Sequence, residues 1–180
     1  MRKIRYITGR GGDAKGGLSA HLETLTEDYG ALAVNHAFLQ QSFLDQVSTV
    51  RKFCITEHCN IIACSYGAYL LLHSMIDQPP ISARVMLLSP VLGQVGFEEA
   101  ELAPITAHEK ALKTAILDGR LGRPKYLEIV TGEKDEICDA ALAVETGEKL
   151  GVEVNVLRSE RHLVTPSKVA IAVSTFLHLE

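Results

Sequence analysis

The sequence has neither an excess of basic residues nor a long apolar run. Its 180 residues include 18 lysines and arginines against 22 aspartates and glutamates, which gives a formal charge of −4. This balance offers no positive footprint for nucleic acid and no polybasic patch for an anionic membrane, so we expect neither partner. No stretch has enough consecutive apolar residues to span a bilayer.

The basic start of the chain lacks the apolar region of a secretory signal peptide. Residues 1–8 read MRKIRYIT, and the run GRGGDAKGG follows where such a peptide would carry its apolar segment. We therefore expect a cytoplasmic protein. The sequence does not indicate an oligomeric state.

The four cysteines form no pattern typical of a disulfide framework or a metal site. They are Cys54, Cys59, Cys64 and Cys138. None forms a C-x-x-C pair, and the first three follow one another at regular gaps of five without the histidine spacing of a zinc site. We predict reduced thiols, three of them buried, and no metal site.

What the sequence does contain is an alternation of short apolar runs with longer helical patterns. Several runs are apolar on both faces, as expected for strands that helices cover on both sides. The predicted strands are 3–8, 31–38, 60–65, 83–90, 125–132 and 152–159, and the predicted helices are 17–28, 43–57, 66–77, 102–118, 138–150 and 166–179.

This alternation predicts the α/β class, with a three-layer α/β/α sandwich around an open, mostly parallel sheet of about six strands. Without an internal repeat or linker, residues 1–180 are expected to form one domain. The longest connection, 90–124, has room for one helix and at most a small cap or lid. In such sheets ligands bind at the carboxyl ends of the strands, so the residues that follow each run are the candidates for a site.

The third predicted strand ends in Ala63-Cys64-Ser65-Tyr66-Gly67, a small-x-Ser-x-Gly pattern between a strand and a helix. A nucleophile elbow needs this pattern, because the strand and helix backbones nearly touch and the flanking positions must be small. The serine then stands at a helix N-terminus, where N–H groups favour developing negative charge. The alternative is that Ser65 only caps the helix.

An acid and a histidine follow later strands. A serine hydroxyl needs a base to take its proton and a third group to orient that base. The fifth run is followed by TGEKDEIC, which contains Asp135, and the sixth by RSERHLVTP, which contains His162. The three candidates therefore lie at carboxyl strand ends in the order Ser, Asp, His. Glu133 is an alternative acid, in which case Asp135 would only cap the helix that starts near Ile137.

Other side chains of similar chemistry have simpler explanations. Cys64 precedes the turn, so we expect it to pack into the core rather than to act as a nucleophile. Only one histidine lies in a late strand-end loop. We expect five others to be surface or satisfied side chains in helical stretches, namely His21, His58, His73, His108 and His178. His36 is predicted to lie in the second strand and is the only other histidine near the sheet edge.

The chain resembles a small, nearly lidless α/β-hydrolase. The matching segments are ACSYG at the elbow, TGEKDEIC at the acid loop and RSERHLV at the histidine loop, and the element order matches over nearly the whole chain. The resemblance implies Ser65 as nucleophile, His162 as general base and then acid, and Asp135 as the group that orients the imidazole. It also implies that the backbone N–H of Tyr66 contributes to an oxyanion hole.

The second oxyanion donor of that family comes from the loop after the first strand, which here reads TGRGG over residues 8–12. By position the donor is the backbone N–H of Arg10, with Gly11 as the alternative. The chain departs from the family pattern twice. Ala63 replaces the usual first glycine of the elbow and is still small, and Thr8 replaces the usual histidine of the oxyanion loop.

The same loop also fits a dinucleotide-binding fingerprint. Residues 9–14 read GRGGDA, which matches G-x-G-x-x-A directly after the first strand. That fingerprint requires an acidic residue near the end of the second strand, where the chain reads HAFLQQ over 36–41. Lys15 is not followed by serine or threonine, so the loop is not a Walker A motif either. Dinucleotide binding is therefore a lesser alternative.

Together these residues predict a serine hydrolase that cleaves an ester, thioester or amide of a small-molecule acyl substrate through an acyl-enzyme. Such a reaction needs no metal and no organic cofactor. The main alternative is a binding or regulatory protein on a catalytically silent hydrolase scaffold, because a fold does not guarantee a function.

Overall fold

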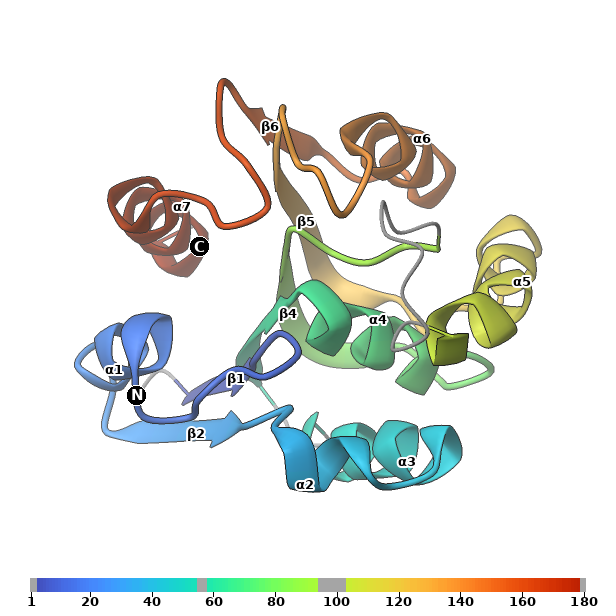
Figure 1. Cartoon of the computed structure of the whole chain (residues 1–180), viewed down its shortest axis with the longest axis horizontal. Helices are drawn as coiled ribbons and strands as arrows, with labels where there is room; N and C mark the ends of the chain where they lie inside the picture. The colour runs from blue at the N-terminus through green and yellow to red at the C-terminus, as the bar shows by residue number, and fades with distance from the viewer. Residues whose placement is uncertain (1–2, 55–57, 94–102, 179–180) are drawn as a thin grey trace.

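Six parallel strands form one open sheet at the centre of the molecule (Figure 1). The structure is a computed structural model and describes residues 3–54, 58–93 and 103–178. The strand order is β2-β1-β3-β4-β5-β6, and each neighbouring pair of these strands is parallel. The strands are β1 (Lys3–Ile7), β2 (Asp28–Leu32), β3 (Cys59–Cys64), β4 (Ile81–Leu88), β5 (Pro124–Gly132) and β6 (Val154–Leu157).

Helices cover both faces of the sheet, which gives the molecule three layers (Figure 1). None of the helices in the described part of the chain is both long and apolar enough to cross a membrane. One face carries α1 (Gly17–Glu23) and α7 (Pro166–His178), and the other carries the short α2 (His36–Leu39) with α3 (Phe43–Cys54), α4 (Ser65–Ser74), α5 (Ala103–Leu117) and α6 (Ala140–Leu150).

The central strands are apolar on both faces because each contributes to two cores. In β3, Ile61 and Ala63 join the apolar cluster beneath α3 to α6, whereas Ile62 joins the cluster beneath α1 and α7. In β4, Val85 and Met86 are divided between the two clusters in the same way. Successive side chains of a strand point to opposite faces, so both faces of these strands are buried. The predicted α/β/α architecture with six strands is confirmed.

The second strand differs from the prediction. β2 spans Asp28–Leu32 instead of 31–38, and α1 ends at Glu23 instead of continuing to residue 28. Every residue of β2 is half-buried, as in an edge strand, so apolar patterning does not mark its bounds. Its first residue is fixed by charge, because the carboxylate of Asp28 accepts a hydrogen bond from Arg5 on β1 (2.9 Å).

The chain leaves the sheet soon after β2 because its backbone finds other partners. The N–H of Val34 donates to the hydroxyl of Thr8 (2.9 Å). Asn35 then caps α2 by accepting the N–H of Phe38 (3.0 Å). His36 therefore lies in a helix and not in a strand, which corrects the sequence prediction.

Two predicted segments fall partly outside the described residues. The structure does not describe residues 94–102, which belong to the connection 90–124. It also does not describe residues 55–57, which end the predicted helix 43–57. His58 lies in a turn with a φ of 53°, rather than in a helix as predicted. The small cap at 90–124 and the single domain over 1–180 stay predictions.

Candidate active site

Ser65 lies at the sharp turn between β3 and α4, with a backbone φ of 47°. Few residues other than glycine adopt a positive φ, and strained residues of this kind cluster at functional sites. The turn makes Ser65 the first residue of α4. The first N–H groups of a helix have no partner within the helix, so they favour negative charge at this point.

The small residues of the elbow pattern are needed because the end of β1 crosses directly beneath the turn. A Cβ atom at Gly67 would overlap the carbonyl oxygen of Thr8 and would lie 2.8 Å from Cγ2 of Ile7. On the other side, a Cβ atom at Gly9 would lie 3.2 Å from Cβ of Ser65. The loop after β1 is therefore packed against the serine.

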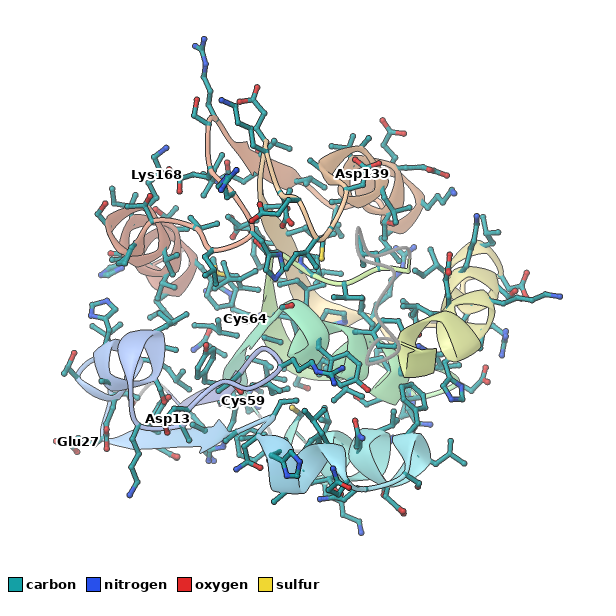
Figure 2. All side chains as sticks on the ribbon, viewed as in Figure 1. Asp13, Glu27, Cys59, Cys64, Asp139 and Lys168 are labelled. Atoms are coloured by element: carbon teal, nitrogen blue, oxygen red, sulfur yellow. The ribbon has the colours of Figure 1, made fainter. Side chains whose placement is uncertain are left out.

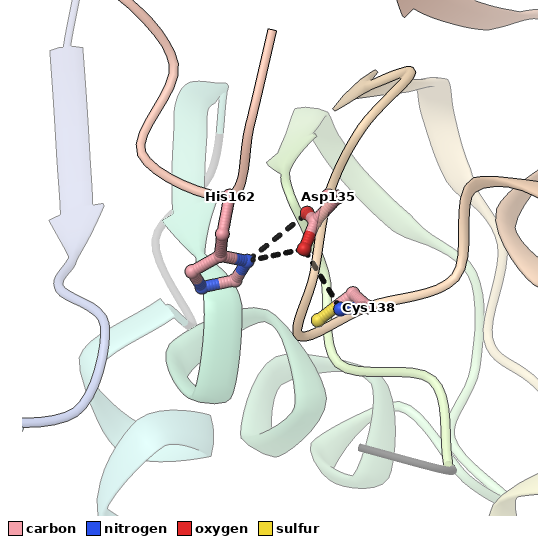
Figure 3. Close-up of side chains that lie close together, drawn as sticks. All are labelled: Asp135, Cys138 and His162. Carbon is pink, nitrogen blue, oxygen red and sulfur yellow. Dashed lines mark hydrogen bonds and ion pairs between the residues drawn. The ribbon is translucent and has the colours of Figure 1, made fainter. Parts of the chain in front are cut away.

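The structure brings Ser65, His162 and Asp135 together in one hydrogen-bond chain. Nε2 of His162 lies 3.0 Å from Oγ of Ser65. Nδ1 lies 3.0 Å from each carboxylate oxygen of Asp135, and Figure 3 shows this second contact. The imidazole side chain is 9% exposed and the Asp135 side chain is fully buried. The three side chains come from the carboxyl ends of β3, β5 and β6, as predicted from their order in the sequence.

Asp135 is held in its ionised form by the groups around it. Burial raises the pKa of its carboxyl, but hydrogen bonds from His162 and from the backbone N–H groups of Cys138 and Ile137 outweigh burial and lower that pKa overall. The two N–H groups lie 2.8 and 2.9 Å from Oδ1. Asp135 therefore bonds the turn that follows it and the imidazole at the same time. It does not cap a helix near Ile137, because α6 begins at Ala140 and its N-cap is Asp139.

The neighbouring acids have other partners. Glu133, the alternative acid, accepts the backbone N–H of Ser159 (2.8 Å). Asp139 precedes α6 and accepts the N–H of Ala141 (2.8 Å), which is an N-cap (Figure 2). The geometry thus places Asp135 at the histidine and assigns the other two to backbone groups.

Solved structures match this chain closely in shape, although no family model matches it and no curated protein matches it in sequence. The ydeN gene product from B. subtilis has a TM-score of 0.72 at 12% identity, over 99% of this chain and 100% of that one. A carboxylesterase structure from Nitrososphaera gargenis has a TM-score of 0.66 at 15% identity, over 98% and 89%. A putative YdeN-like hydrolase from Pectobacterium atrosepticum has a TM-score of 0.63 at 16% identity, over 95% and 87%.

This chain has the α/β-hydrolase fold. The likeness extends over nearly the full length of each chain, so it includes the element order from which the resemblance was drawn. At this level of identity the likeness establishes the fold, and the chemistry of the site has to be argued from its own residues.

The loop after β1 in this α/β-hydrolase fold narrows the choice of a second oxyanion donor. The N–H of Gly11, the alternative donor, is bonded to the carbonyl of Val34 (2.8 Å), and the N–H of Gly12 is bonded to that of Gly9 (3.0 Å). Arg10 lies in the turn that the bond between Gly9 and Gly12 closes. The assignment of the Arg10 N–H to an oxyanion hole stays a prediction.

Tyr66, the other predicted donor, is rigidly placed by its own side chain. Its hydroxyl donates to Oε1 of Gln46 on α3 (3.0 Å), and the amide nitrogen of Gln46 donates to the carbonyl of Gln41 (2.9 Å). Burial raises the pKa of the Tyr66 hydroxyl to about 12, against a lowering effect of the Arg10 charge. No sequence motif identified Gln46, because a buried glutamine on a helix carries no spacing signal.

The histidine loop of the α/β-hydrolase fold is closed by Glu160, which the sequence analysis also missed. Its carboxylate accepts the backbone N–H and the hydroxyl of Thr165 (2.7 and 2.8 Å) and pairs with Lys168 at the start of α7 (2.8 Å; Figure 2). These bonds join the two ends of a six-residue loop that contains His162. These bonds help to hold the shape of the loop.

Asp135, Cys138 and His162 have donor atoms within 4.8 Å of one another, a spacing that also suits a metal ion (Figure 3). Burial and the Asp135 charge raise the pKa of the Cys138 thiol, so the sulfur keeps its proton near neutral pH. The carboxylate and Nδ1 already bond each other. A proton-transfer chain describes these groups better than a metal site does.

All four cysteines are free, and Figure 2 labels Cys59 and Cys64. Cys54, Cys59 and Cys138 are buried and Cys64 is half-buried, which agrees with the prediction that three of them are buried. Burial raises the pKa of the Cys64 thiol to about 11, and the sulfur accepts a hydrogen bond from Tyr6 (3.5 Å). A thiol of this kind is a poor nucleophile, so Cys64 does not compete with Ser65 as the nucleophile.

The structure does not support dinucleotide binding by the glycine-rich loop, because the residues directly after β2 include no acid. After β2 the chain continues as Ala33-Val34-Asn35, none of which offers a carboxylate to a ribose. The acid of β2, Asp28, is at the opposite end of the strand and pairs with Lys3 and Arg5.

Proposed function

We propose that this chain is a serine hydrolase that cleaves an ester, thioester or amide through an acyl-enzyme. One observation carries the proposal, namely that one imidazole lies 3.0 Å from the Ser65 hydroxyl on one side and 3.0 Å from the Asp135 carboxylate on the other. These are the distances that proton transfer from a nucleophile to an oriented base requires. That several structures of this fold are named hydrolases or carboxylesterases supports it further.

In the first half-reaction Oγ of Ser65 attacks the acyl carbon, and its proton passes to Nε2 of His162. The carbonyl oxygen becomes an oxyanion, which the backbone N–H groups of Tyr66 and Arg10 bind. The tetrahedral intermediate then collapses. The bond to the leaving group breaks, the leaving group takes the proton from Nε2, and the acyl group stays on Ser65 as an ester.

In the second half-reaction a water molecule takes the place of the leaving group. His162 accepts a proton from the water as its oxygen attacks the acyl carbon. Collapse of this second intermediate breaks the ester bond to Ser65, returns the proton to Oγ, and releases the carboxylic acid. No metal or organic cofactor takes part.

Asp135 makes this proton transfer directional. Its pKa is lowered despite burial, because His162 and two backbone N–H groups bond the carboxylate. An ionised carboxylate keeps the imidazole proton on Nδ1, so that Nε2 is free of a proton when it faces Ser65. It also stabilises the imidazolium that forms during each half-reaction.

Labelling with a fluorophosphonate probe tests the proposal. We expect the folded protein to be labelled once, at Ser65, and Ser65→Ala and His162→Ala to abolish labelling. Ser167→Ala removes an exposed hydroxyl on α7 and is the matched control. We expect this variant to be labelled like the wild type. A folded protein that is not labelled would instead support the catalytically silent scaffold.

In our proposal the site accepts a small acyl group. The connection 90–124 has room for at most a small cap, so little of the chain could cover a long acyl group. Hydrolysis of p-nitrophenyl esters of increasing chain length, measured on the wild type and on Ser167→Ala, should be fastest for short acyl groups. A clear preference for the longest chains would contradict this part of the proposal.

A further inference from the structure

The segment that follows β4 contacts both partners of the proposed proton transfer. β4 lies between β3, which leads to Ser65, and β5, which leads to Asp135. The hydroxyl of Ser89 donates to the backbone carbonyl of His162 (3.1 Å). Two residues later the N–H of Val91 donates to the backbone carbonyl of Ser65 (3.2 Å). One short segment therefore bonds the backbone of the base and the backbone of the nucleophile.

Ser89 itself is firmly anchored. It is 4% exposed, and its N–H donates to the carbonyl of Val130 at the end of β5 (2.7 Å). The other polar backbone group of His162, its N–H, donates to the carboxylate of Glu136 (3.2 Å), which is exposed. The bond from Ser89 is thus the more buried of the two, and water competes with it less.

The backbone of Ser89 is strained, with a φ of 41°. Glycine adopts this conformation without a steric penalty, whereas a residue with a Cβ atom does not. A non-glycine residue persists in such a conformation where its surroundings hold it there, which is common where a side chain has a function. Here the Cβ atom carries the hydroxyl that bonds His162.

We propose that Ser89 is a positioning residue, whose hydroxyl fixes the backbone of His162 so that the imidazole reaches Oγ of Ser65. This inference rests on the proposed hydrolase function and adds a residue that acts through the histidine. Without the hydroxyl the carbonyl of His162 loses its buried donor, and the imidazole shifts relative to a nucleophile whose own backbone stays bonded to Val91. A shift of about 1 Å at a reacting group lowers turnover by up to roughly 100-fold.

Two substitutions separate the hydroxyl from the strain. Ser89→Ala removes the hydroxyl and keeps the Cβ atom, whereas Ser89→Gly removes the hydroxyl and relieves the strain. We expect both variants to hydrolyse p-nitrophenyl acetate with a kcat roughly 10- to 100-fold lower and a KM within about 2-fold of wild type. The melting temperature of Ser89→Gly should exceed that of Ser89→Ala by about 2–4 °C.

The activity of Ser89→Gly decides between a positioning role and a structural one. If kcat recovers in Ser89→Gly together with the melting temperature, the loss in Ser89→Ala comes from stability and the proposal is wrong. Unchanged kcat in Ser89→Ala also overturns it. In both cases the wild-type enzyme is active, so the proposed function survives the failure of this inference.

A measurement without turnover tests the same residue independently. The Nδ1 proton that His162 shares with Asp135 gives a low-field proton signal in NMR spectra, which His162→Ala identifies by its disappearance. We expect this signal to shift or broaden in Ser89→Ala and in Ser89→Gly. A signal identical to wild type would show that the imidazole has not moved, even if no ester were hydrolysed.

Discussion

At the residue scale, Asp135 serves three hydrogen-bond donors with two oxygen atoms. Oδ1 accepts the backbone N–H groups of Ile137 and Cys138, and both oxygens lie 3.0 Å from Nδ1 of His162. The backbone donors fix which way the carboxylate faces. The imidazole is therefore oriented by a group that is itself held in place, which is what an efficient general base requires.

The substitution Asp135→Asn should remove activity without unfolding the protein. The amide oxygen can keep the two backbone bonds, which leaves the amide nitrogen facing Nδ1. Two donors cannot bond each other, so the imidazole carries its proton on Nε2 and cannot accept one from Ser65. We expect kcat for p-nitrophenyl acetate to fall by roughly 10⁴-fold, with little change in melting temperature.

Glu133→Gln is the matched control for that substitution, because Glu133 accepts a backbone N–H from Ser159 and not from the imidazole. It should retain most of the activity. If Glu133→Gln were the inactive variant and Asp135→Asn the active one, the acid would have been assigned to the wrong residue.

The proposed reactive residues could be found in the sequence because each follows an apolar strand and belongs to a recognisable motif. Ser65 has small neighbours, and Asp135 and His162 follow in a familiar order. Ser89 has no such signal, because a serine at a strand end is typical of an ordinary turn. Its partner is 73 residues away, so its use depends on a contact that only the folded chain makes.

At the element scale, the acid loop and the histidine loop support each other. They cross at Gly132, where a Cβ atom would lie 2.5 Å from the carbonyl oxygens of Glu160 and Arg161. The N–H of Lys134 donates to the same carbonyl of Glu160 (2.8 Å). Contact this close requires glycine at the end of β5, and it couples the position of the histidine loop to that of the acid loop.

The carboxylate of Glu160 should make the histidine loop sensitive to acid. Hydrogen bonds from Lys168 and Thr165 lower the pKa of Glu160 to about 2, against an ordinary value of 4.5. Because the pKa is lower in the folded state, the stabilisation is fully present above the unfolded value and is lost as the pH falls toward the folded one. The window of loss therefore lies between about pH 4.5 and about pH 2.

Urea unfolding of wild type and Glu160→Gln over this pH range checks the prediction. The wild type should be the more stable protein at neutral pH, and the difference should shrink as the pH falls through the window. Glu148→Gln, which changes an exposed carboxylate on α6, is the control. A difference between wild type and Glu160→Gln that stays constant with pH would contradict a role of the charge.

The sequence predicts the bounds of a strand where burial determines them. It does not predict them where polar contacts determine where the strand ends. β3 and β4 are apolar on both faces and stand out in the sequence. The end of β2 depends on a hydroxyl of Thr8 that binds Val34, 26 residues away. Local patterning cannot report such a contact, so the apolar run was assigned to a strand that in fact ends at Leu32.

At the scale of the whole molecule, topology places the site. All neighbouring strands of the described sheet are parallel, so their carboxyl ends meet at one edge. Ser65 and His162 are 97 residues apart in the sequence, yet their side chains are hydrogen-bonded. This convergence follows from strand–helix alternation alone, which is why the position of the site could be predicted before the details of its loops.

Arg84 of β4 attaches helix α7 to the sheet. Its guanidinium lies 5.0 Å from the ring centre of Tyr126 on β5 and 5.1 Å from that of Phe176 on α7. Nη2 donates to the backbone carbonyl of Phe176 (2.7 Å), one of the last carbonyls of the helix, which have no partner within it. One side chain thus joins two strands and the end of the helix that follows the histidine loop.

The substitution Arg84→Lys should loosen the end of α7 and leave the site intact. A lysine keeps the charge, but it lacks the flat group that lies over both rings while donating to a carbonyl. We expect the free energy of unfolding to fall by about 1–2 kcal/mol, and amide hydrogen exchange to accelerate in the last turns of α7. Labelling at Ser65 should proceed at the wild-type rate, because Arg84 lies toward the start of β4 and the site lies at its end.

Arg120→Lys is the control, since Arg120 pairs with Asp77 on the surface (2.8 Å). This substitution should change stability by less than about 0.5 kcal/mol. Equal effects of the two substitutions would mean that Arg84 acts as an ordinary surface charge, and the attachment of α7 would then depend on its apolar contacts alone.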